Sequence, residues 1–154
     1  MFAPDRSGTQ FRLQGGSLNA DLAIAEMNTV VAELKAPASK PDDLARYAQA
    51  SGDLNPLHLD PEFARQAGFD SLVVHGMLGM AHLGRLLTDN FPVEQIRSFS
   101  ARFGAVVLAG QTVTYRARLI ERSAESATLA LEASDSNGKT AITGRAEVLL
   151  GLKG

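Results

Sequence analysis

A run of apolar residues at positions 72–87 is the feature that most limits how this chain can fold. The run, LVVHGMLGMAHLGRLL, also contains His75, His82 and Arg85. It falls short of the roughly 20 residues that a membrane-spanning helix needs, and ionisable side chains at the centre of a bilayer are costly. A helix that is apolar on nearly every side and does not cross a membrane must be surrounded by protein. We therefore predict a helix over residues 71–89 that the rest of the domain wraps, and we expect no membrane partner.

The segments around this helix show the alternation of apolar and polar residues that is typical of β-strands. One such segment precedes the helix at residues 28–36, with Val30, Ala32 and Leu34 on the face expected to be buried. Four follow it, at residues 97–103, 112–122, 127–133 and 139–150. Asn137-Gly138, between the last two, favours a two-residue type I′ hairpin turn, in which both residues have positive φ.

Two shorter helices are expected before the long one. The first covers residues 41–51, and Ser39 is expected to cap it because its side-chain oxygen can accept hydrogen bonds from the free amides there. Pro41 suits the first turn of this helix. A single helical turn is expected at residues 61–67, within a segment rich in Gly, Asn, Asp and Pro.

This order of elements predicts an α+β fold in which one curled antiparallel sheet wraps one long apolar helix, the hotdog fold. Such a sheet has an edge strand with unpaired backbone groups, and two copies that pair edge to edge would cover it. We therefore expect at least a homodimer. Residues 27–154 form the predicted domain, and residues 1–26 a loosely ordered lead-in that lacks the continuous apolar core of an export signal.

The composition limits the possible partners and chemistries. Fifteen Lys and Arg against 17 Asp and Glu give the 154-residue chain a formal charge of -2, which argues against nucleic acid as a partner. Hydrophobic residues make up 45% of the chain, enough to fill a core. The chain contains no cysteine, which excludes a disulfide framework, a thiolate metal site and a cysteine nucleophile. This composition suits a reducing compartment, and we expect the protein to be cytoplasmic.

Asp53 and His58 are the main candidates for chemistry. They lie in the loop SGDLNPLH, where Gly52 allows a backbone conformation closed to most residues and Asn55-Pro56 favours a tight turn. The turn can direct both side chains to a common space. A carboxylate and an imidazole that hold one water there could remove a proton from it and return one elsewhere. The alternative is that Asp53 caps local backbone and His58 is a surface residue, and the spacing alone does not separate the two.

The other two histidines adjoin glycines of the predicted long helix. His75 opens this helix together with Gly76, whose free amide at the positive end of the helix dipole could stabilise an oxyanion, including a thioester enolate. The structural alternative for such glycines is close packing, which we favour for Gly79 and Gly84. We interpret His82 as a satisfied core residue.

Other motifs fail on their spacing. Residues 138–140, Gly-Lys-Thr, lack the earlier glycine of a phosphate-binding loop, and the helix glycines do not match a dinucleotide-binding fingerprint. The chain has no helical His-x-x-x-His pair, so we expect no metal site, although a site assembled from separate histidines stays open.

The stretch over residues 47–80, YAQASGDLNPLHLDPEFARQAGFDSLVVHGMLGM, resembles the hydratase signature of MaoC-like proteins. These are the R-specific enoyl-CoA hydratases and (3R)-hydroxyacyl-thioester dehydratases. The matching positions are Tyr47, Ser51-Gly52-Asp53, Asn55-Pro56, His58 and His75-Gly76-Met77. A weaker likeness extends over residues 27–150.

The resemblance implies a hotdog-fold dimer and a lyase. The implied reaction is reversible hydration of trans-2-enoyl thioesters of CoA or acyl carrier protein to (3R)-3-hydroxyacyl thioesters in fatty-acid metabolism. Asp53 and His58 would hold the catalytic water, and the Gly76 amide would bind the thioester carbonyl. His75 and Asn55 complete the implied substrate-binding set, with Asn55 supporting the loop. No metal or redox cofactor is implied.

Two positions depart from the family pattern. Some members carry a serine near Gly84, where this chain has no hydroxyl, and Gln111 stands where many members have aspartate. The alternatives are an acyl-thioesterase of the same fold and a non-catalytic acyl-thioester-binding subunit. Both Asp53 and His58 are present and no hydrolase acid is evident, which favours hydration over either alternative.

Overall fold

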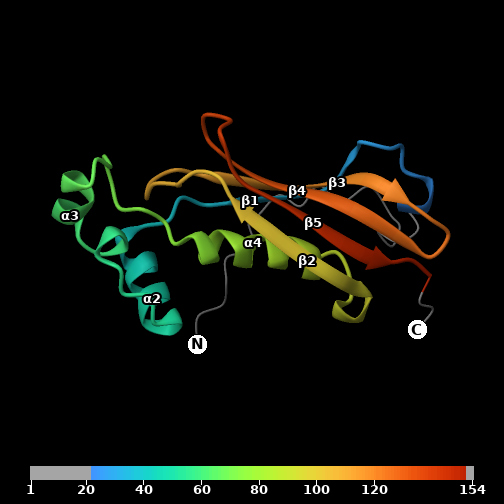
Figure 1. Cartoon of the computed structure of the whole chain (residues 1–154), viewed down its shortest axis with the longest axis horizontal. Coiled ribbons are helices and arrows are strands. Elements are labelled where there is room, and N and C mark those ends of the chain that lie inside the picture. The colour runs from blue at the N-terminus through green and yellow to red at the C-terminus, as the bar shows by residue number, and fades with distance from the viewer. Residues whose placement is uncertain (1–21, 152–154) are drawn as a thin grey trace.

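A five-stranded antiparallel sheet forms the body of the molecule (Figure 1). The computed structural model describes residues 22–151. The strands lie in the order β1-β3-β4-β5-β2, and each neighbouring pair is antiparallel. Their bounds are β1 Val30–Ala36, β2 Ile96–Phe103, β3 Val113–Arg122, β4 Ser126–Asp135 and β5 Thr140–Leu149. These bounds confirm the five predicted strands to within about two residues, the usual uncertainty of such boundaries.

The long helix α4, Gly76–Thr88, lies against the concave face of the curled sheet (Figure 1). Leu83, Leu86 and Leu87 are almost fully buried there, in one cluster with alternate residues of the strands such as Leu129 and Val148. Alternate residues of a strand point to the same face of a sheet, so this cluster is the core that the strand pattern predicts. The α+β hotdog fold is thereby confirmed.

The predicted helix over residues 71–89 begins five residues too early. Residues 71–75 are not helical, and Val73 instead forms an isolated β-bridge with Leu108. The amide of Val74 donates to the Val107 carbonyl, and that of Ala109 to the Leu72 carbonyl. A short apolar run suits a bridge as well as a helix, and here the backbone partners at residues 107–109 decide between them.

The curled sheet covers one side of α4, in agreement with the predicted arrangement of sheet and helix. One face of the helix remains exposed in the single chain: Gly76, Met77, Ala81, Arg85 and Thr88. The opposite face holds the buried leucines. In the single chain the sheet therefore covers α4 on one face only.

Two local predictions in the strands are wrong. A β-bulge between Val30 and Ala32 lets Val31 turn inward as well, so Val31 is buried and Val30 is exposed. In the β4–β5 turn only Gly138 has positive φ, so the turn is not of type I′. The Asp135 carboxylate accepts hydrogen bonds from the amides of Asn137 and Lys139, and this side chain, rather than the Asn-Gly pair, sets the turn geometry.

The shorter helices lie together beyond the start of α4 (Figure 1). They are α2, Pro41–Ser51, and α3, Pro61–Gln66, as predicted to within a residue. The predicted cap is wrong: Lys40 rather than Ser39 occupies the N-cap of α2, and its amide donates to the Asp43 carboxylate at 2.9 Å. An acidic side chain at this position can serve the start of a helix in place of a serine.

The first described residues belong to the core. Residues 22–24 are helical, Leu22 is fully buried, and Arg122 donates to the carbonyls of Leu22 and Ala25. Residues 1–21, most of the predicted lead-in, lie outside the described residues, and its boundary at residue 26 stays a prediction. Over residues 22–151, no helix is both long and apolar enough to cross a membrane.

Candidate active site

The loop between α2 and the 3-10 helix η1, Pro56–His58, is shaped by hydrogen bonds within its own sequence. Gly52 ends α2 with φ of 78°, a left-handed conformation that favours glycine. The amide of Asp53 donates to the Ser51 hydroxyl at 3.2 Å, and the amide of Asn55 to the Asp53 carboxylate at 3.3 Å. The Asn55 side chain in turn accepts from the Leu57 amide at 3.0 Å and caps η1. Each polar side chain of the loop therefore fixes backbone close to itself.

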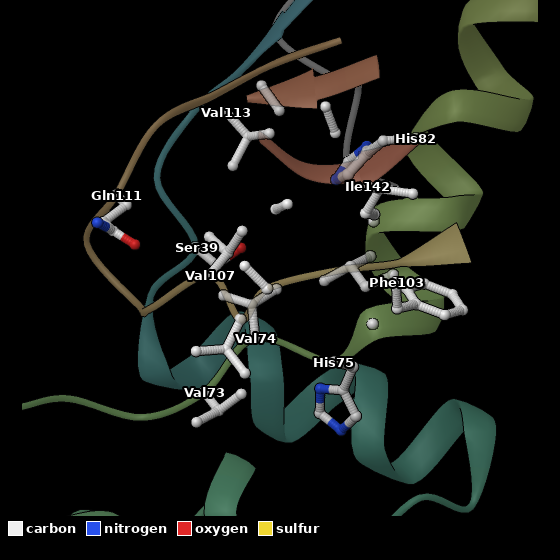
Figure 2. Close-up of a pocket in the computed structure, with 18 of the residues that line it drawn as sticks. Ser39, Val73, Val74, His75, His82, Phe103, Val107, Gln111, Val113 and Ile142 are labelled. Carbon is white, nitrogen blue, oxygen red and sulfur yellow. The ribbon is translucent and has the colours of Figure 1, made fainter. Parts of the chain in front are cut away.

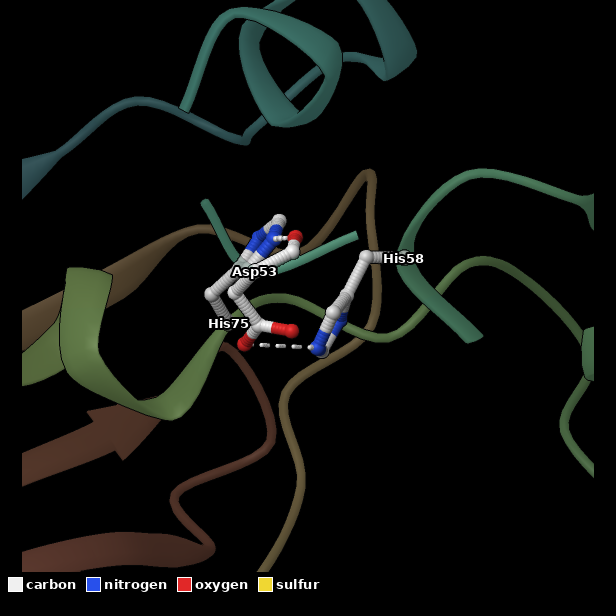
Figure 3. Close-up of side chains that lie close together, drawn as sticks. All are labelled: Asp53, His58 and His75. Atoms are coloured by element: carbon white, nitrogen blue, oxygen red, sulfur yellow. Dashed lines mark hydrogen bonds and ion pairs between the residues drawn. The ribbon is translucent and has the colours of Figure 1, made fainter. Parts of the chain in front are cut away.

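This loop brings the two main candidates together. The Oδ2 atom of Asp53 lies 3.6 Å from Nε2 of His58, with the Asp53 side chain 51% exposed and that of His58 only 10% (Figure 3). The separation is too long for a good direct hydrogen bond. It is short enough for one small polar molecule to contact both side chains.

The other ring nitrogen of His58 is held by backbone. Its Nδ1 lies 2.6 Å from the carbonyl oxygen of Val73. A carbonyl oxygen can only accept, so Nδ1 carries the hydrogen and donates it. In the neutral ring Nε2 is then an unprotonated acceptor that faces the Asp53 carboxylate.

His75 packs directly on this pair. Its ring stacks on that of His58 with centroids 3.7 Å apart, and Tyr47 contacts it edge-on at 4.8 Å. Its Nε2 lies 3.2 Å from the backbone carbonyl of Asp53 and donates to it. Burial is the main reason that the pKa of His75 lies below its ordinary value of 6.5, although the hydrogen bond to Asp53 opposes it. The ring is therefore neutral at pH 7.

The Nδ1 atom of His75 lacks a hydrogen-bond partner among the described residues, although it is buried. In the neutral ring with hydrogen on Nε2, this nitrogen is a bare acceptor. A buried acceptor without a partner carries a desolvation cost.

Gly76 is the first residue of α4, directly after His75 at the N-cap. Its amide is one of those at a helix start that have no partner within the helix. A Cβ on this residue would lie 3.3 Å from the Phe103 ring, so a larger residue would crowd this corner. The amide points from the positive end of the helix dipole, where partial negative charge is favoured.

A cavity of about 340 Å³ opens beside these groups, and we call it the central cavity. Its volume is within the range of small-molecule sites. His58, His75 and Gly76 line one end of it, while His82 and Ile142 lie at the opposite end (Figure 2). The walls between them are mostly apolar, including Val74, Val107 and Val113. Asp53 does not line the cavity, but its carboxylate lies next to His58, which does.

Several residues have surroundings that differ from those predicted for them. Asn55 does not line the central cavity, and its side chain serves the loop. His82 is not a satisfied core residue, because it lines the cavity and its ring makes no hydrogen bond with any residue of the described range. Of the two glycines predicted to allow close packing, Gly79 does so: a Cβ there would lie 2.6 Å from Ile142 Cδ1. Gly84 has room for a side chain, since a Cβ there would lie 3.6 Å from Phe99 Cε1, an ordinary contact distance.

Sequence reasoning missed two contributors to the site and gave a third no role. The Val73 carbonyl carries no side-chain signal, and Tyr115 looks like an ordinary inward residue of a strand. Tyr47 enters the sequence analysis only as a position of the signature. The helical spacing of Tyr47 from Leu44 and Ala48 places it on the inner face of α2, but nothing in the sequence identifies His75 as its neighbour.

Asp53, His58 and His75 also form a set of potential metal ligands. One ligand atom of each lies within 4.8 Å of the other two. However, His58 Nδ1 and His75 Nε2 already donate to carbonyl oxygens. The two rings are stacked, 23° from parallel, so their remaining lone pairs do not converge on one point as tetrahedral coordination requires. The arrangement fits a held water better than a metal ion.

Comparison with known proteins identifies the family. The model of the MaoC like domain matches residues 23–136. The chain belongs to the MaoC-like family. An (R)-specific enoyl-CoA hydratase from Aeromonas caviae is 34% identical over 112 residues, which cover 70% of this chain and 84% of that enzyme. A mitochondrial 3-hydroxyacyl-[acyl-carrier-protein] dehydratase from Arabidopsis thaliana is 36% identical over 101 residues.

Solved structures of MaoC-like proteins share the fold. The A. caviae (R)-hydratase involved in PHA biosynthesis superposes with a TM-score of 0.72 and 32% identity, over 83% of this chain and 98% of that one. The hydratase PhaJ1 from Pseudomonas aeruginosa gives a TM-score of 0.74 at 25% identity, over 86% of each chain. The chain spans 60% of the Arabidopsis enzyme, and only 27% of a probable enoyl-CoA hydratase from Dictyostelium discoideum.

Proposed function

We propose that this MaoC-like protein is a hydro-lyase that reversibly hydrates trans-2-enoyl thioesters to (3R)-3-hydroxyacyl thioesters. One observation carries the proposal. Two acceptors, Asp53 Oδ2 and His58 Nε2, lie 3.6 Å apart at the end of an apolar cavity that is also lined by the first residue of a helix, Gly76. The A. caviae and Arabidopsis relatives, whose names describe an enoyl-CoA hydratase and a hydroxyacyl-carrier-protein dehydratase, support the same reaction class.

The pair of acceptors sets the course of the reaction. A water between them donates one hydrogen to each and directs a lone pair at C3 of the enoyl group. As the oxygen–C3 bond forms, the C2–C3 π electrons move to the thioester carbonyl and give an enolate. His58 Nε2 takes one proton from the water, and the imidazolium delivers it to C2 when the enolate collapses. All atoms come from water and thioester, so the reaction needs neither oxidant nor reductant.

Two groups stabilise charge along this course. The Gly76 amide donates to the thioester oxygen, where negative charge develops in the enolate. The Val73 carbonyl, which accepts from His58 Nδ1, stabilises the transient imidazolium. Donor and acceptor are both backbone atoms, so neither has to reorganise during the reaction.

His75 and Asn55 act as positioning residues in this proposal. His75 fixes the Asp53 backbone through its Nε2 hydrogen bond and supports the His58 ring by stacking. Asn55 caps η1 and thereby holds the turn between Asp53 and His58. His75 also lines the cavity beside Gly76, where it limits the space for the thioester.

The thioester partner is acyl-CoA or acyl carrier protein, with no separate cofactor. The protein is proposed to act as a homodimer. Among residues 22–151, β2 pairs only with β5, and no described strand lies along its outer edge. Phe103 at the end of β2 and Met77 on α4 are about half exposed, and a second copy would cover them. Size-exclusion chromatography with light scattering tests this, and a clean monomer at micromolar concentration contradicts it.

We propose that the protein is located in the cytoplasm. The absence of cysteine suits a reducing compartment, although the Arabidopsis relative is named as mitochondrial. Fractionation of the cells that make the protein, followed by immunoblotting, tests this proposal. Recovery of the protein with an organelle or an exported fraction contradicts it.

The reaction is tested by mixing the purified protein with crotonyl-CoA and following the loss of enoyl absorbance, in parallel with the Asp53→Asn variant. Turnover by the wild type that collapses in the variant is the expected result. Release of free CoA would favour the acyl-thioesterase alternative. Binding of crotonyl-CoA without any turnover would favour a non-catalytic acyl-thioester-binding subunit.

A further inference from the structure

The end of the central cavity that lies opposite His75, which we call the inner end, carries two polar side chains that the proposed reaction does not use. His82 lies on α4, and Tyr115 lies on β3, 33 positions later in the sequence. Their rings contact each other with centroids 5.3 Å apart. Both line the cavity, and Figure 2 shows His82 beside Ile142 at the opposite end from His75.

Neither side chain makes a hydrogen bond to another residue within the described range 22–151. Tyr115 is only 4% exposed, so its hydroxyl has little contact with bulk solvent. A Cβ on Gly79 would lie 3.9 Å from the hydroxyl oxygen, which puts that oxygen next to α4, at the cavity wall. Two polar groups without protein partners thus face a mostly apolar space.

Both groups are neutral at pH 7. Burial raises the pKa of Tyr115 to about 12. Burial, with a smaller contribution from the nearby Arg85 charge, lowers the pKa of His82 below 6.5. A neutral imidazole offers one donor and one acceptor, and a tyrosine hydroxyl offers both as well. The pair therefore suits a neutral group that can donate or accept rather than an ion.

A plain alkyl chain is a poor occupant of this end. It would displace water from His82 and Tyr115 and supply no hydrogen bond in return, which leaves buried polar groups unpaired. A site with such groups discriminates strongly against substrates that lack the matching polar atom. A purely aliphatic chain would be served better by leucine and phenylalanine at these two positions.

We propose that the inner end of the central cavity selects 2-enoyl thioesters whose acyl chain carries a neutral oxygen, as a hydroxyl or carbonyl, that hydrogen-bonds His82 and Tyr115. This inference rests on the proposed function, because it places the thioester carbonyl at the Gly76 amide. His82 lies six positions after Gly76 in α4, which corresponds to roughly 9 Å along the helix axis. An extended chain of about eight carbons reaches from one to the other.

The test compares kcat/KM for pairs of CoA thioesters that differ only in a terminal hydroxyl. The pairs are hex-2-enoyl and oct-2-enoyl chains with and without the hydroxyl, and crotonyl-CoA serves as the short reference. We expect at least one hydroxylated chain to exceed its plain partner by about tenfold. A plain chain that matches or exceeds its hydroxylated partner at both lengths overturns the inference.

Variants then identify the groups responsible. Tyr115→Phe and His82→Leu are each expected to reduce the ratio of hydroxylated to plain substrate toward one, while His82→Gln, which keeps a donor and an acceptor, retains it. Thr114→Val is the matched control for loss of a hydroxyl, since Thr114 neighbours Tyr115 but points to the other face of β3. A preference that survives both Tyr115→Phe and His82→Leu overturns the assignment to this pair.

The failure of this inference is distinguishable from failure of the proposed function. Turnover of crotonyl-CoA without any hydroxyl preference overturns the inference and leaves the hydration reaction standing. No turnover of any of the five thioesters contradicts both. Because the wild-type ratios decide the main question, the inference stays testable even if a variant does not fold.

Discussion

The polar side chains at the two ends of the central cavity are held in place by different kinds of contact. At the end next to Asp53, ring nitrogens of His58 and His75 donate to backbone carbonyls, and side chains of the loop fix one another's amides. At the inner end, His82 and Tyr115 meet only through their rings. Fixed hydrogen bonds suit a reaction that needs one geometry. Polar groups held by packing alone remain available to a ligand.

The largest effect is expected at the first of these ends. His58→Ala and Asp53→Asn should each lower kcat for crotonyl-CoA by roughly 10² to 10⁴. The first removes the base, and the second replaces a charged carboxylate acceptor with a neutral amide that holds the attacking water less strongly. The double variant should be little slower than the slower single variant, since both residues act on the same water. Initial rates, with circular dichroism to verify folding, check this. Losses that multiply in the double variant would mean that the two side chains act separately.

A smaller effect is expected along the helix that joins the two ends. Gly84→Ala should stabilise the protein by about 1 kcal/mol, because alanine favours a helix and its methyl group has room. Gly79→Ala should gain clearly less, since its methyl would meet Ile142 Cδ1 at 2.6 Å and that side chain must move toward the cavity. Urea unfolding measures both variants. Equal increases in unfolding free energy for the two variants would show that the Ile142 side chain moves without cost.

The smallest and most gradual effect concerns pH, and it applies to both ends. The pKa values of His75 and His82 are lowered in the folded protein, mainly by burial, so below pH 6.5 the unfolded chain takes up protons first. Their contribution to stability is therefore complete above pH 6.5 and is lost as the pH falls below it.

The unfolding free energy, measured from about pH 7.5 to about pH 5.5, should thus decrease. His75→Phe and His82→Leu should each make the decrease less steep, because each removes one histidine that must be charged. Thr114→Val, which removes no histidine, is the comparison variant. An unchanged slope in both His75→Phe and His82→Leu would contradict the burial argument at the corresponding ends.

The sequence predicts the reactive end far better than the inner end, and the reason is distance along the chain. Asp53, Asn55 and His58 are joined by hydrogen bonds across two or three residues, so their spacing already contains most of the local geometry. The contact of His82 with Tyr115 exists only after α4 has packed on the sheet. Alternation of residues shows that Tyr115 points inward, but not which residue it meets.

The same reasoning explains the errors in the fold. The sheet is predictable because alternation over seven to ten residues is a strong signal. The start of α4 is not, because residues 72–74 are apolar in either conformation and the backbone groups of residues 107–109 decide the outcome. The bulge at Val31 likewise depends on register with β3, which the sequence of β1 alone does not contain.

The use of a main-chain atom to orient His58 affects how the protein tolerates mutation. Every amino acid at position 73 would still present a carbonyl oxygen, so no single substitution there deletes the acceptor for His58 Nδ1. What can be lost is its location, which depends on the bridge between Val73 and Leu108 and on the Val74 amide bond to Val107. Genetic variation that impairs the reaction should therefore appear also around residues 107–109, in a connecting segment that contributes no reactive side chain.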